Sequence, residues 1–434
     1  MDGAAHQLPQ GGIVLEYGLI GGRLGHSYSK LIHEMLCGYR YDLCPLPTEA
    51  DARAFLEKRA FKAINVTLPY KRLVMEYCSF IDPRAKAIGA VNTVVNHNGL
   101  LYGYNTDYLG FAHLCAAHGV DFTGRTVLIL GTGGTHNTTS AVARDKGAAK
   151  ILTVSRKPDP AKGELSYEEA VHSGAQIVIN TTPAGMYPNV GTCNLDIAAM
   201  PGLEAVLDVV YNPEKTEIIL RAEEAGVPVA ASGLEMLVAQ AVYAAEYFLG
   251  RKFEDAPAEI SRVTAAIRRD TFNVVLIGMP SSGKSTIGRM LAEKLGKRFL
   301  DLDDEVVKAD GRTIPEIFAA EGEDSFRRKE TEQTARFAKE GRQLLSCGGG
   351  VIKRPENIRL LRQNGVILFL DRPLEALTVG GGRPLSSSTD ALRAMYTERR
   401  PLYLAAADAV VPNHTTVTDA VNAAMEALDE IFDH

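Results

Sequence analysis

The sequence predicts an α/β protein in which parallel sheets are covered by helices. Three observations support this fold class. Short apolar runs typical of buried strands recur along the chain, among them TVLILG, KILTVS and QIVINTT between residues 126 and 182. Segments with helical spacing separate these runs, and strands joined by helices form parallel sheets. The pattern then restarts at NVVLIG (273–278), which indicates a further parallel sheet.

The 434 residues favour two or three domains. We expect a substrate-binding domain over residues 1–110, completed by a long helix at 234–250. A Rossmann-like nucleotide-binding domain is expected over 111–233. A charged segment with one proline (251–271) is expected to link these parts to a P-loop domain of the nucleoside monophosphate kinase type over 272–434.

Composition excludes several classes of function. The net charge is −6 and no long basic run is present, so we expect no nucleic-acid partner. No apolar run approaches the roughly 20 residues of a membrane-spanning helix, and the N-terminus lacks a secretion signal. We therefore expect a cytoplasmic protein with no membrane partner. The six cysteines show no CxxC spacing, which argues against both a disulfide framework and a zinc site.

Four loops in the first zone are rich in small polar side chains. They are Gly25–Ser29 (GHSYS), Asn65–Lys71 (NVTLPYK), Gly89–Thr93 (GAVNT) and Gly103–Asp107 (GYNTD). Such hydroxyls, amides, a lysine and an aspartate can bind a polyhydroxylated acid through many hydrogen bonds. The alternative is that they are turn and helix-cap residues, which holds for most such loops taken singly.

A glycine-rich loop follows the strand expected at 126–131. Gly131, Gly133 and Gly134 match the dinucleotide fingerprint, but His136 stands where its third glycine is expected. A strand–helix connection without a ligand is the alternative interpretation. The next strand ends at Ser155, Arg156 and Lys157. Arginine at this place suits the 2′-phosphate of NADP, whereas NAD enzymes carry an acidic residue there, so the sequence favours NADP.

Together these motifs closely resemble the shikimate dehydrogenase family over residues 14–250. The resemblance implies reduction of 3-dehydroshikimate to shikimate by NADPH, with Lys71 and Asp107 as the catalytic pair. Its implied substrate contacts are the carboxylate-binding Ser27 and Ser29, the hydroxyl-binding Asn65, Thr67, Asn92 and Asp107, and the closing residues Tyr211 and Gln240. The chemistry agrees, because hydride delivery to a ketone needs a proton donor, and lysine is a charged donor at neutral pH.

The P-loop pattern occurs once, at Gly278-x4-Gly283-Lys284-Ser285, followed by Thr286. It lies after the strand expected at 273–278 and before a helix expected at about 284–295, which is the context that this motif requires. Backbone N–H groups must approach phosphate oxygens closely, so side chains are excluded from the turn. Lys284 is expected to contact the β- and γ-phosphates of ATP, and the Ser285 hydroxyl to bind Mg²⁺.

Further motifs identify the phosphoryl acceptor. Asp301 and Asp303 are two residues apart at the end of an expected strand, so both carboxylates would face one site. Beyond them come FRRKE (326–330), GGG (348–350), GRPL (382–385) and ERRPLY (398–403). Each arginine alone is more often a solvated surface charge. In this order, over residues 272–415, the motifs resemble the shikimate kinase family.

That resemblance implies transfer of the γ-phosphoryl group of ATP to the C3 hydroxyl of shikimate. Asp301 would support Mg²⁺ with Ser285, and Asp303 would orient the hydroxyl and accept its proton. Arg327 and Arg399 would bind the acceptor carboxylate, as suits a planar anion. Gly349 and Gly350 would let the backbone approach the ring of the acceptor. Arg383, on a lid, would close over the phosphoryl group during its transfer.

The two resemblances predict one bifunctional enzyme of aromatic amino-acid biosynthesis, using NADPH, ATP and Mg²⁺ on small-molecule substrates. Fold alone would not support this, because both architectures host many functions. Two alternatives remain. The first zones could form a sensor that binds shikimate-like ligands and regulates the kinase, or they could oxidise quinate with NAD.

Overall fold

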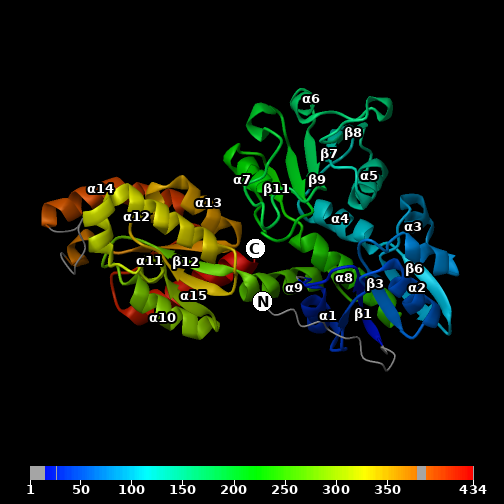
Figure 1. Cartoon of the computed structure of the whole chain (residues 1–434), viewed down its shortest axis with the longest axis horizontal. Coiled ribbons are helices and arrows are strands. Elements are labelled where there is room, and N and C mark those ends of the chain that lie inside the picture. Colours follow the sequence, from blue (N-terminus) through cyan, green and yellow to red (C-terminus); the bar gives the residue numbers. More distant parts are fainter. Residues whose placement is uncertain (1–14, 26, 379–387, 434) are drawn as a thin grey trace. The chain divides into compact units, whose positions relative to one another are not determined.

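The structure is a computed structural model in which residues 15–25, 27–378 and 388–433 are described. The chain divides into two compact units, drawn in Figure 1. Unit 1 contains the residues up to Tyr211 together with Thr216–Thr264. Unit 2 contains Asn212–Lys215 and the residues from Ala265 onward. Within the described ranges, no helix is long and apolar enough to cross a membrane.

The first sheet of unit 1 has six described strands in the order β2-β1-β3-β5-β6-β4. Their bounds are β1 Tyr17–Gly21, β2 Asp42–Pro45, β3 Ala63–Val66, β4 Phe80–Ile81, β5 Thr93–His97 and β6 Leu100–Tyr104. This sheet is mixed, because β5 runs antiparallel to both β3 and β6. The parallel expectation fails here since Asn98 and Gly99, both at positive φ, join β5 to β6 in a two-residue hairpin.

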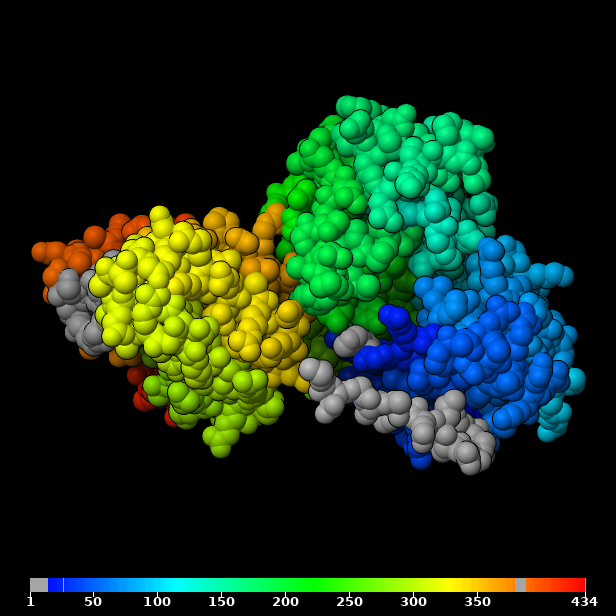
Figure 2. Space-filling view, viewed as in Figure 1, coloured from blue at the N-terminus to red at the C-terminus, as the bar shows by residue number. Residues whose placement is uncertain are grey.

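Helices α1 Ser29–Cys37, α2 Glu49–Lys58, α3 Pro83–Ile88 and α4 Thr106–Ala117 accompany this sheet. The second sheet of unit 1 is parallel throughout, in the order β11-β10-β9-β7-β8. Its elements are β7 Thr126–Leu130, α5 Gly134–Asp145, β8 Lys150–Val154, α6 Tyr167–Val171, β9 Ile177–Asn180, β10 Ala205–Asp208, α7 Glu217–Glu224 and β11 Val229–Ala231. In Figure 2 the first part of unit 1 is blue and its second part is cyan to green.

Helix α8 (Leu234–Leu249) returns the chain to the first sheet and packs on α4. The two helices touch at Gly110, where an added Cβ would lie 2.6 Å from the carbonyl oxygen of Met236. The Glu235 carboxylate of α8 meets His113 Nε2 at 3.3 Å and His118 Nε2 at 2.9 Å, both from α4 or its C-cap. This close packing fixes Asp107 and Gln240 relative to each other, because they lie on α4 and α8.

Helix α9 (Ala256–Thr271) leads into unit 2, and its C-terminus is held by a buried lysine. Lys297 Nζ donates to the carbonyl oxygens of Arg269, Asp270 and Phe272 at 2.8, 3.2 and 2.7 Å. Arg269 and Asp270 lie in the last turn of the helix, whose carbonyls lack intrahelical partners, and Phe272 follows the helix. Burial lowers the pKa of Lys297 to about 8.

The sheet of unit 2 is parallel, in the order β13-β14-β12-β15-β16 among the described residues. Its strands are β12 Asn273–Ile277, β13 Arg298–Asp301, β14 Gln343–Ser346, β15 Gly365–Asp371 and β16 Ala409–Pro412. Its helices are α10 Lys284–Leu295, α11 Leu302–Asp310, α12 Ile314–Ala338, α13 Pro355–Gln363, α14 Thr389–Ala406 and α15 Val417–Asp433. The strand and helix expected around the P-loop are thus present.

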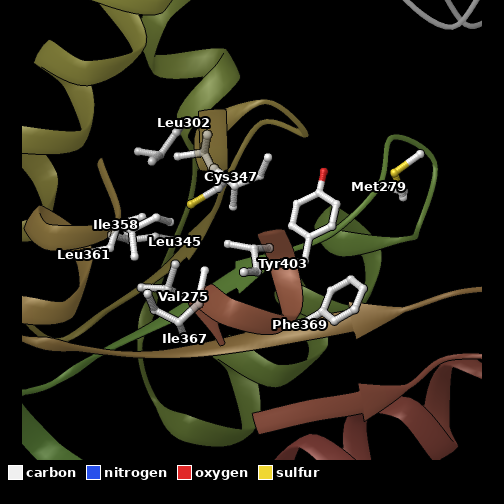
Figure 3. Close-up of a cluster of buried hydrophobic side chains, with 14 of the residues drawn as sticks. Val275, Met279, Leu302, Leu345, Cys347, Ile358, Leu361, Ile367, Phe369 and Tyr403 are labelled. Carbon is white, nitrogen blue, oxygen red and sulfur yellow. The ribbon is translucent and has the colours of Figure 1, made fainter. Parts of the chain in front are cut away.

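One hydrophobic core of unit 2 lies directly beneath the P-loop edge of the sheet (Figure 3). Phe369 of β15 stacks on Tyr403 of α14 with ring centroids 5.1 Å apart. Val275 and Ile367, from the neighbouring strands β12 and β15, are fully buried in the same cluster. Apolar burial of this kind contributes about 25 cal/mol per Å². The core therefore holds α14 against the strands whose ends form the site.

We predict that Glu235→Gln destabilises the protein in a pH-dependent way. Burial opposes ionisation of Glu235, but His113 and His118 outweigh it and lower the pKa of Glu235 to about 2, below its usual value of about 4.5. A depressed pKa stabilises the folded state above pH 4.5, and this contribution is lost as the pH falls toward 2. After allowance for solvent screening, the loss at pH 5.5 is about 1 kcal/mol.

Calorimetric melting of the wild type and the variant at pH 5.5 and pH 3 measures this effect. The difference in Tm is expected to be about 2–4 °C at pH 5.5 and to shrink at pH 3. Glu168→Gln, on the exposed face of α6, is the control and is expected to leave Tm unchanged. A Tm difference that does not vary with pH would contradict the assignment.

Candidate active sites

Lys71 and Asp107 form an ion pair in unit 1, with Lys71 Nζ 2.6 Å from Asp107 Oδ2. Lys71 lies on the loop after β3, and Asp107 lies in the first turn of α4. The turn is fixed by its N-cap residue Asn105, whose side chain accepts a hydrogen bond from the N–H of Tyr108. The side chains of the pair are 23% and 19% exposed, so a ligand can reach both.

Two predicted carboxylate-binding hydroxyls lie together at the start of α1. Ser27 Oγ donates to Ser29 Oγ at 3.0 Å, and the N–H of Ser29 donates to Ser27 Oγ at 3.2 Å. The helix N-terminus beside them favours an anion. The ring of Tyr211 lies 5.5 Å from that of Tyr28, between the two serines in sequence, so the structure brings Tyr211 to the same place.

The other predicted substrate residues of unit 1 lie on or beside the strands and helices that carry these groups. Asn65 and Asn92 are buried neighbours, with Asn65 Nδ2 3.3 Å from the carbonyl oxygen of Asn92. Thr67 follows β3, and its methyl group packs against Gly21. Gln240 packs against Gly110 on α4 and donates to the carbonyl oxygen of Leu237 within its own helix.

The predicted dinucleotide loop joins β7 to α5. Gly131 has a φ of +101°, and an added Cβ would lie 2.8 Å from the side chain of Thr182, so glycine is required there. At Gly133 and Gly134 an added Cβ would meet nothing within 4 Å. That open space lies at the N-terminus of α5, which fits a pyrophosphate.

His136 replaces the third glycine of the fingerprint and points to β8. Its Nε2 lies 2.9 Å from Thr153 Oγ1, two residues before Ser155. The following side chains of Arg156 and Lys157 are exposed, with the loop held by a hydrogen bond from the N–H of Lys157 to Ser155 Oγ. These exposed cations fit the extra phosphate of NADP.

In unit 2 the P-loop runs from β12 to α10. Gly278 and Gly283 have φ values of +152° and +85°, and the fully buried Ser282 between them is held by Asn413, whose amide donates to its carbonyl oxygen. Lys284 Nζ donates to the carbonyl oxygens of Gly278 and Met279, each at 2.9 Å. The lysine thus lies against the loop that would hold the phosphates. Thr286 is exposed on the first turn of α10.

The predicted metal residues meet directly, since Ser285 Oγ donates to Asp301 Oδ2 at 2.7 Å. The prediction for Asp303 was wrong in its geometry: Asp301 ends β13, but Asp303 lies in the first turn of α11. Asp301 acts as the N-cap of that helix and accepts from the N–H of Asp303 at 3.2 Å. The Asp301 carboxylate thus contacts Asp303 through this cap and not through strand alternation.

Arg327 and Arg399 are both buried, at 6% and 4% exposure. Arg327 pairs with Glu330 at 2.9 Å and with Glu323 at 3.1 Å. Arg399 donates from Nη1 to the carbonyl oxygen of Gly349 at 2.9 Å, whereas its Nε has no hydrogen-bond partner within the described part of the chain. A buried donor left without a partner costs about 1–3 kcal/mol, which a bound anion would offset.

At each of the three glycines 348–350 an added Cβ would meet a close neighbour. An added Cβ would lie 2.4 Å from Asp303 Oδ1 at Gly348, 2.9 Å from Pro280 at Gly349, and 2.1 Å from the guanidinium of Arg327 at Gly350. The glycines therefore bring an acidic group, the P-loop and a basic group together around one backbone turn. Arg383 and the rest of the predicted lid at 379–387 lie outside the described residues.

Sequence reasoning gave no role to Glu330 and Tyr403. Glu330 is 1% exposed, and burial raises its pKa to about 7 although the Arg327 guanidinium opposes the shift. Tyr403 donates to the carbonyl oxygen of Gly349 at 2.5 Å. The i,i+3 spacing of Arg327 and Glu330 on one helix was the signal that would have predicted their ion pair.

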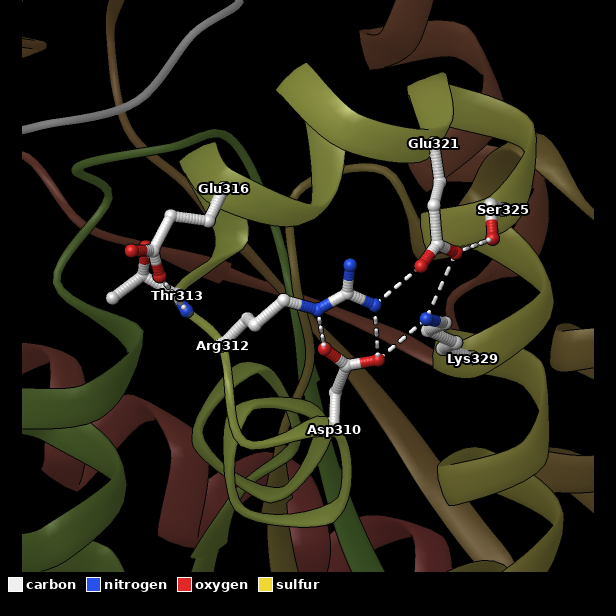
Figure 4. A network of polar contacts seen from close by, with 7 residues as sticks. All are labelled: Asp310, Arg312, Thr313, Glu316, Glu321, Ser325 and Lys329. Atoms are coloured by element: carbon white, nitrogen blue, oxygen red, sulfur yellow. Dashed lines mark hydrogen bonds and ion pairs between the residues drawn. The ribbon is translucent and has the colours of Figure 1, made fainter.

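A network of ion pairs supports the helix that carries Arg327 (Figure 4). Asp310, at the end of α11, binds both Arg312 and Lys329, and Glu321 binds the same two cations. Arg312 and Lys329 hold the pKa of Asp310 well below its usual range. Helix α12 departs from helical geometry at Gly322 (φ +80°), so the network bridges this break and fixes the half that follows it.

Comparisons with known proteins agree with both resemblances. A family described as shikimate dehydrogenase substrate binding domain matches residues 19–94, and one described as shikimate kinase matches residues 280–429. The shikimate dehydrogenase (NADP(+)) of Clostridium beijerinckii is 36% identical over 244 residues, which cover 53% of this chain and 90% of that protein. Its counterpart from Clostridium perfringens is 35% identical over 259 residues, covering 56% and 95%.

Solved structures show the same similarity. A chorismate mutase/shikimate 5-dehydrogenase fusion protein from Clostridium acetobutylicum has a TM-score of 0.54 at 30% identity, over 58% of this chain and 96% of that chain. Shikimate 5-dehydrogenase from Thermus thermophilus, in complex with NADP(H) and shikimate, has a TM-score of 0.52 at 27% identity, over 57% and 98%.

We predict that Gly350→Ala weakens binding of the phosphoryl acceptor in unit 2. The new Cβ would overlap the Arg327 guanidinium, which would move because it is the end of a flexible side chain. The acceptor KM is expected to rise about tenfold, equivalent to about 1.4 kcal/mol, with the KM for ATP unchanged. Steady-state kinetics with each substrate varied measures this, and Gly191→Ala, in unit 1 where an added Cβ would meet nothing within 4 Å, is the control. An unchanged acceptor KM would contradict the role of Arg327.

Proposed function

The chain belongs to the shikimate dehydrogenase family and carries a shikimate kinase domain, and on this basis we propose that it catalyses two consecutive steps of the shikimate pathway. Unit 1 reduces 3-dehydroshikimate to shikimate with NADPH. Unit 2 transfers a phosphoryl group from ATP to shikimate. The observation that carries the first activity is the partly exposed ion pair of Lys71 and Asp107, 2.6 Å apart.

In the reduction, NADPH supplies the hydride. Negative charge then develops on the carbonyl oxygen of the substrate, and Lys71 donates the proton that neutralises it. Asp107 holds the ammonium group in place through their ion pair. Ser27 and Ser29 bind the substrate carboxylate at the N-terminus of α1, and this contact orients the ring and its reacting carbonyl.

In the phosphorylation, Lys284 and the P-loop N–H groups bind the phosphates of ATP. Ser285 and Asp301 have the hydroxyl and carboxylate oxygens that Mg²⁺ prefers, and their 2.7 Å contact supports a shared metal. Asp303 orients the acceptor hydroxyl and accepts its proton. The Nε of buried Arg399, unpaired among the described residues, supports its role in binding the acceptor carboxylate together with Arg327, and Arg383 remains the predicted lid residue.

A coupled assay tests the proposal. Incubation with 3-dehydroshikimate, NADPH and MgATP is expected to produce shikimate 3-phosphate, and omission of ATP is expected to stop the reaction at shikimate. A protein that phosphorylates shikimate but does not oxidise NADPH would be a kinase with a sensor domain. Faster oxidation of quinate with NAD than of shikimate with NADP would identify a quinate dehydrogenase.

We predict that the two activities separate by mutation. Lys71→Ala is expected to lower the reduction rate by at least about 10²-fold, because it removes the proton donor, and to leave phosphorylation unchanged. Lys284→Ala is expected to abolish phosphorylation and to leave reduction unchanged. Initial rates of NADPH oxidation and of ADP release measure the two activities. Loss of both activities in either variant would contradict independent sites.

We also predict that Arg156 determines the preference for NADPH. Arg156→Ala is expected to raise the KM for NADPH about tenfold, through loss of a charge-assisted hydrogen bond to the 2′-phosphate, without changing the KM for NADH. Lys162→Ala, on the same loop but paired with Asp159, is the matched control. An equal effect on NADH and NADPH would show that Arg156 does not contact the 2′-phosphate.

A further inference from the structure

The amide of Asn65 is fixed by the protein on both sides. Its Oδ1 accepts a hydrogen bond from the hydroxyl of Tyr41 at 2.8 Å. Its Nδ2 donates to Thr93 Oγ1 at 3.1 Å and to the carbonyl oxygen of Asn92 at 3.3 Å. The amide therefore has one defined orientation, with its nitrogen toward β5 and its oxygen toward Tyr41.

These contacts continue to the catalytic helix. Thr93 Oγ1 lies 2.9 Å from Thr106 Oγ1, and Asn92 Oδ1 accepts from the N–H of Thr106 at 2.7 Å. Thr106 is the first residue of α4 and precedes Asp107. Tyr41, Thr93 and Thr106 are completely buried, so this network is held in a low-dielectric interior where its hydrogen bonds are strong.

Tyr41 itself is held rigidly by stacked rings. The imidazole of His33, on α1, lies parallel to the Tyr41 ring with centroids 4.1 Å apart, and Phe248 of α8 stacks on His33 at 5.6 Å. Burial lowers the pKa of His33 to about 3, so the imidazole places no charge behind Asn65 at neutral pH. The hydroxyl of Tyr41 consequently has a fixed position from which to direct the amide.

We propose that Tyr41 is a positioning residue of the dehydrogenase site, acting through Asn65 to set the geometry in which substrate hydroxyls are bound. The Nδ2 contacts to Thr93 and to the Asn92 carbonyl oxygen fix which end of the amide is the nitrogen, and the Tyr41 hydroxyl fixes the position of Oδ1. Without that hydroxyl, Oδ1 loses its donor, so the amide is held less firmly and binds the substrate less well. This inference rests on the proposed reduction of 3-dehydroshikimate and its reverse, oxidation of shikimate.

A purely structural role is the competing explanation, because a buried hydroxyl also contributes to stability. Tyr39→Phe separates the two. Tyr39 belongs to the same stack of rings and donates to or accepts from His33 Nδ1 at 2.7 Å, but its hydroxyl has no described contact with Asn65. Removal of either hydroxyl perturbs the cluster, whereas only Tyr41→Phe releases the amide.

The test is steady-state kinetics of shikimate oxidation by NADP⁺ with the full chain. Tyr41→Phe is expected to raise the KM for shikimate about 3- to 10-fold, as loss of one buried hydrogen bond implies, with kcat within about twofold and the KM for NADP⁺ unchanged. Tyr39→Phe is expected to leave all three parameters within about twofold of the wild type. In the Asn65→Ala background, Tyr41→Phe is expected to have no further effect, because the two residues act as one unit.

A KM for shikimate that stays within about twofold in Tyr41→Phe would overturn the inference, as would an equal rise in Tyr39→Phe or additive effects with Asn65→Ala. If Tyr41→Phe melts below the assay temperature, Thr93→Val replaces it, since it removes the acceptor on the other side of the amide. If the wild type oxidises shikimate with NADP⁺ and the variants have the same kinetic parameters as the wild type, only this inference is contradicted. A wild type that does not oxidise shikimate with NADP⁺ contradicts the proposed function as well.

Discussion

A sharp turn from a parallel strand into a helix, possible only for glycine, is the constraint on which both nucleotide sites depend. In unit 1 the turn follows β7 at Gly131, where φ is +101° and an added Cβ would lie 2.8 Å from the Thr182 side chain and 3.1 Å from Thr181 Oγ1. In unit 2 the turn follows β12 at Gly278, where an added Cβ would lie 2.9 Å from the carbonyl oxygen of Leu370. Both turns direct a helix N-terminus, with its unpaired N–H groups, at the carboxyl edge of a sheet.

The acceptor side of unit 2 shows how glycine also allows charges to gather. Asp303, Glu330 and Arg327 all contact the backbone of residues 348–350, where any Cβ would displace them. Such groups are buried at considerable cost unless they are paired, and Arg327 satisfies this by binding two carboxylates. Arg327 and Glu330, both buried, thus concentrate charge beside the P-loop where electrostatic interactions are strongest.

Local patterns predicted much of this molecule from its sequence. The P-loop, its strand and its helix were predictable because the motif fixes backbone geometry within a few residues. The Asn98–Gly99 hairpin was also readable in principle, but the helices on either side of that zone favoured a parallel interpretation. The placement of Asp303 was not predictable. The hydrogen bond between the Asp301 side chain and the N–H of Asp303 starts helix α11 at this point, so Asp303 lies in a helix and not in the strand. Long-range partners such as Tyr41 and Asn65 carry no local signal, since 24 residues separate them.

The end of helix α9 has a consequence for behaviour in mildly alkaline solution. The ammonium group of Lys297 has three hydrogens, and three main-chain carbonyls receive them. A neutral amine has only two hydrogens to offer, so loss of the proton, with a pKa of about 8, leaves one carbonyl of the terminal turn without its donor. Above that pH, slight fraying where α9 meets β12 would loosen the start of β12, the strand that leads into the P-loop. The surrounding core would stay intact.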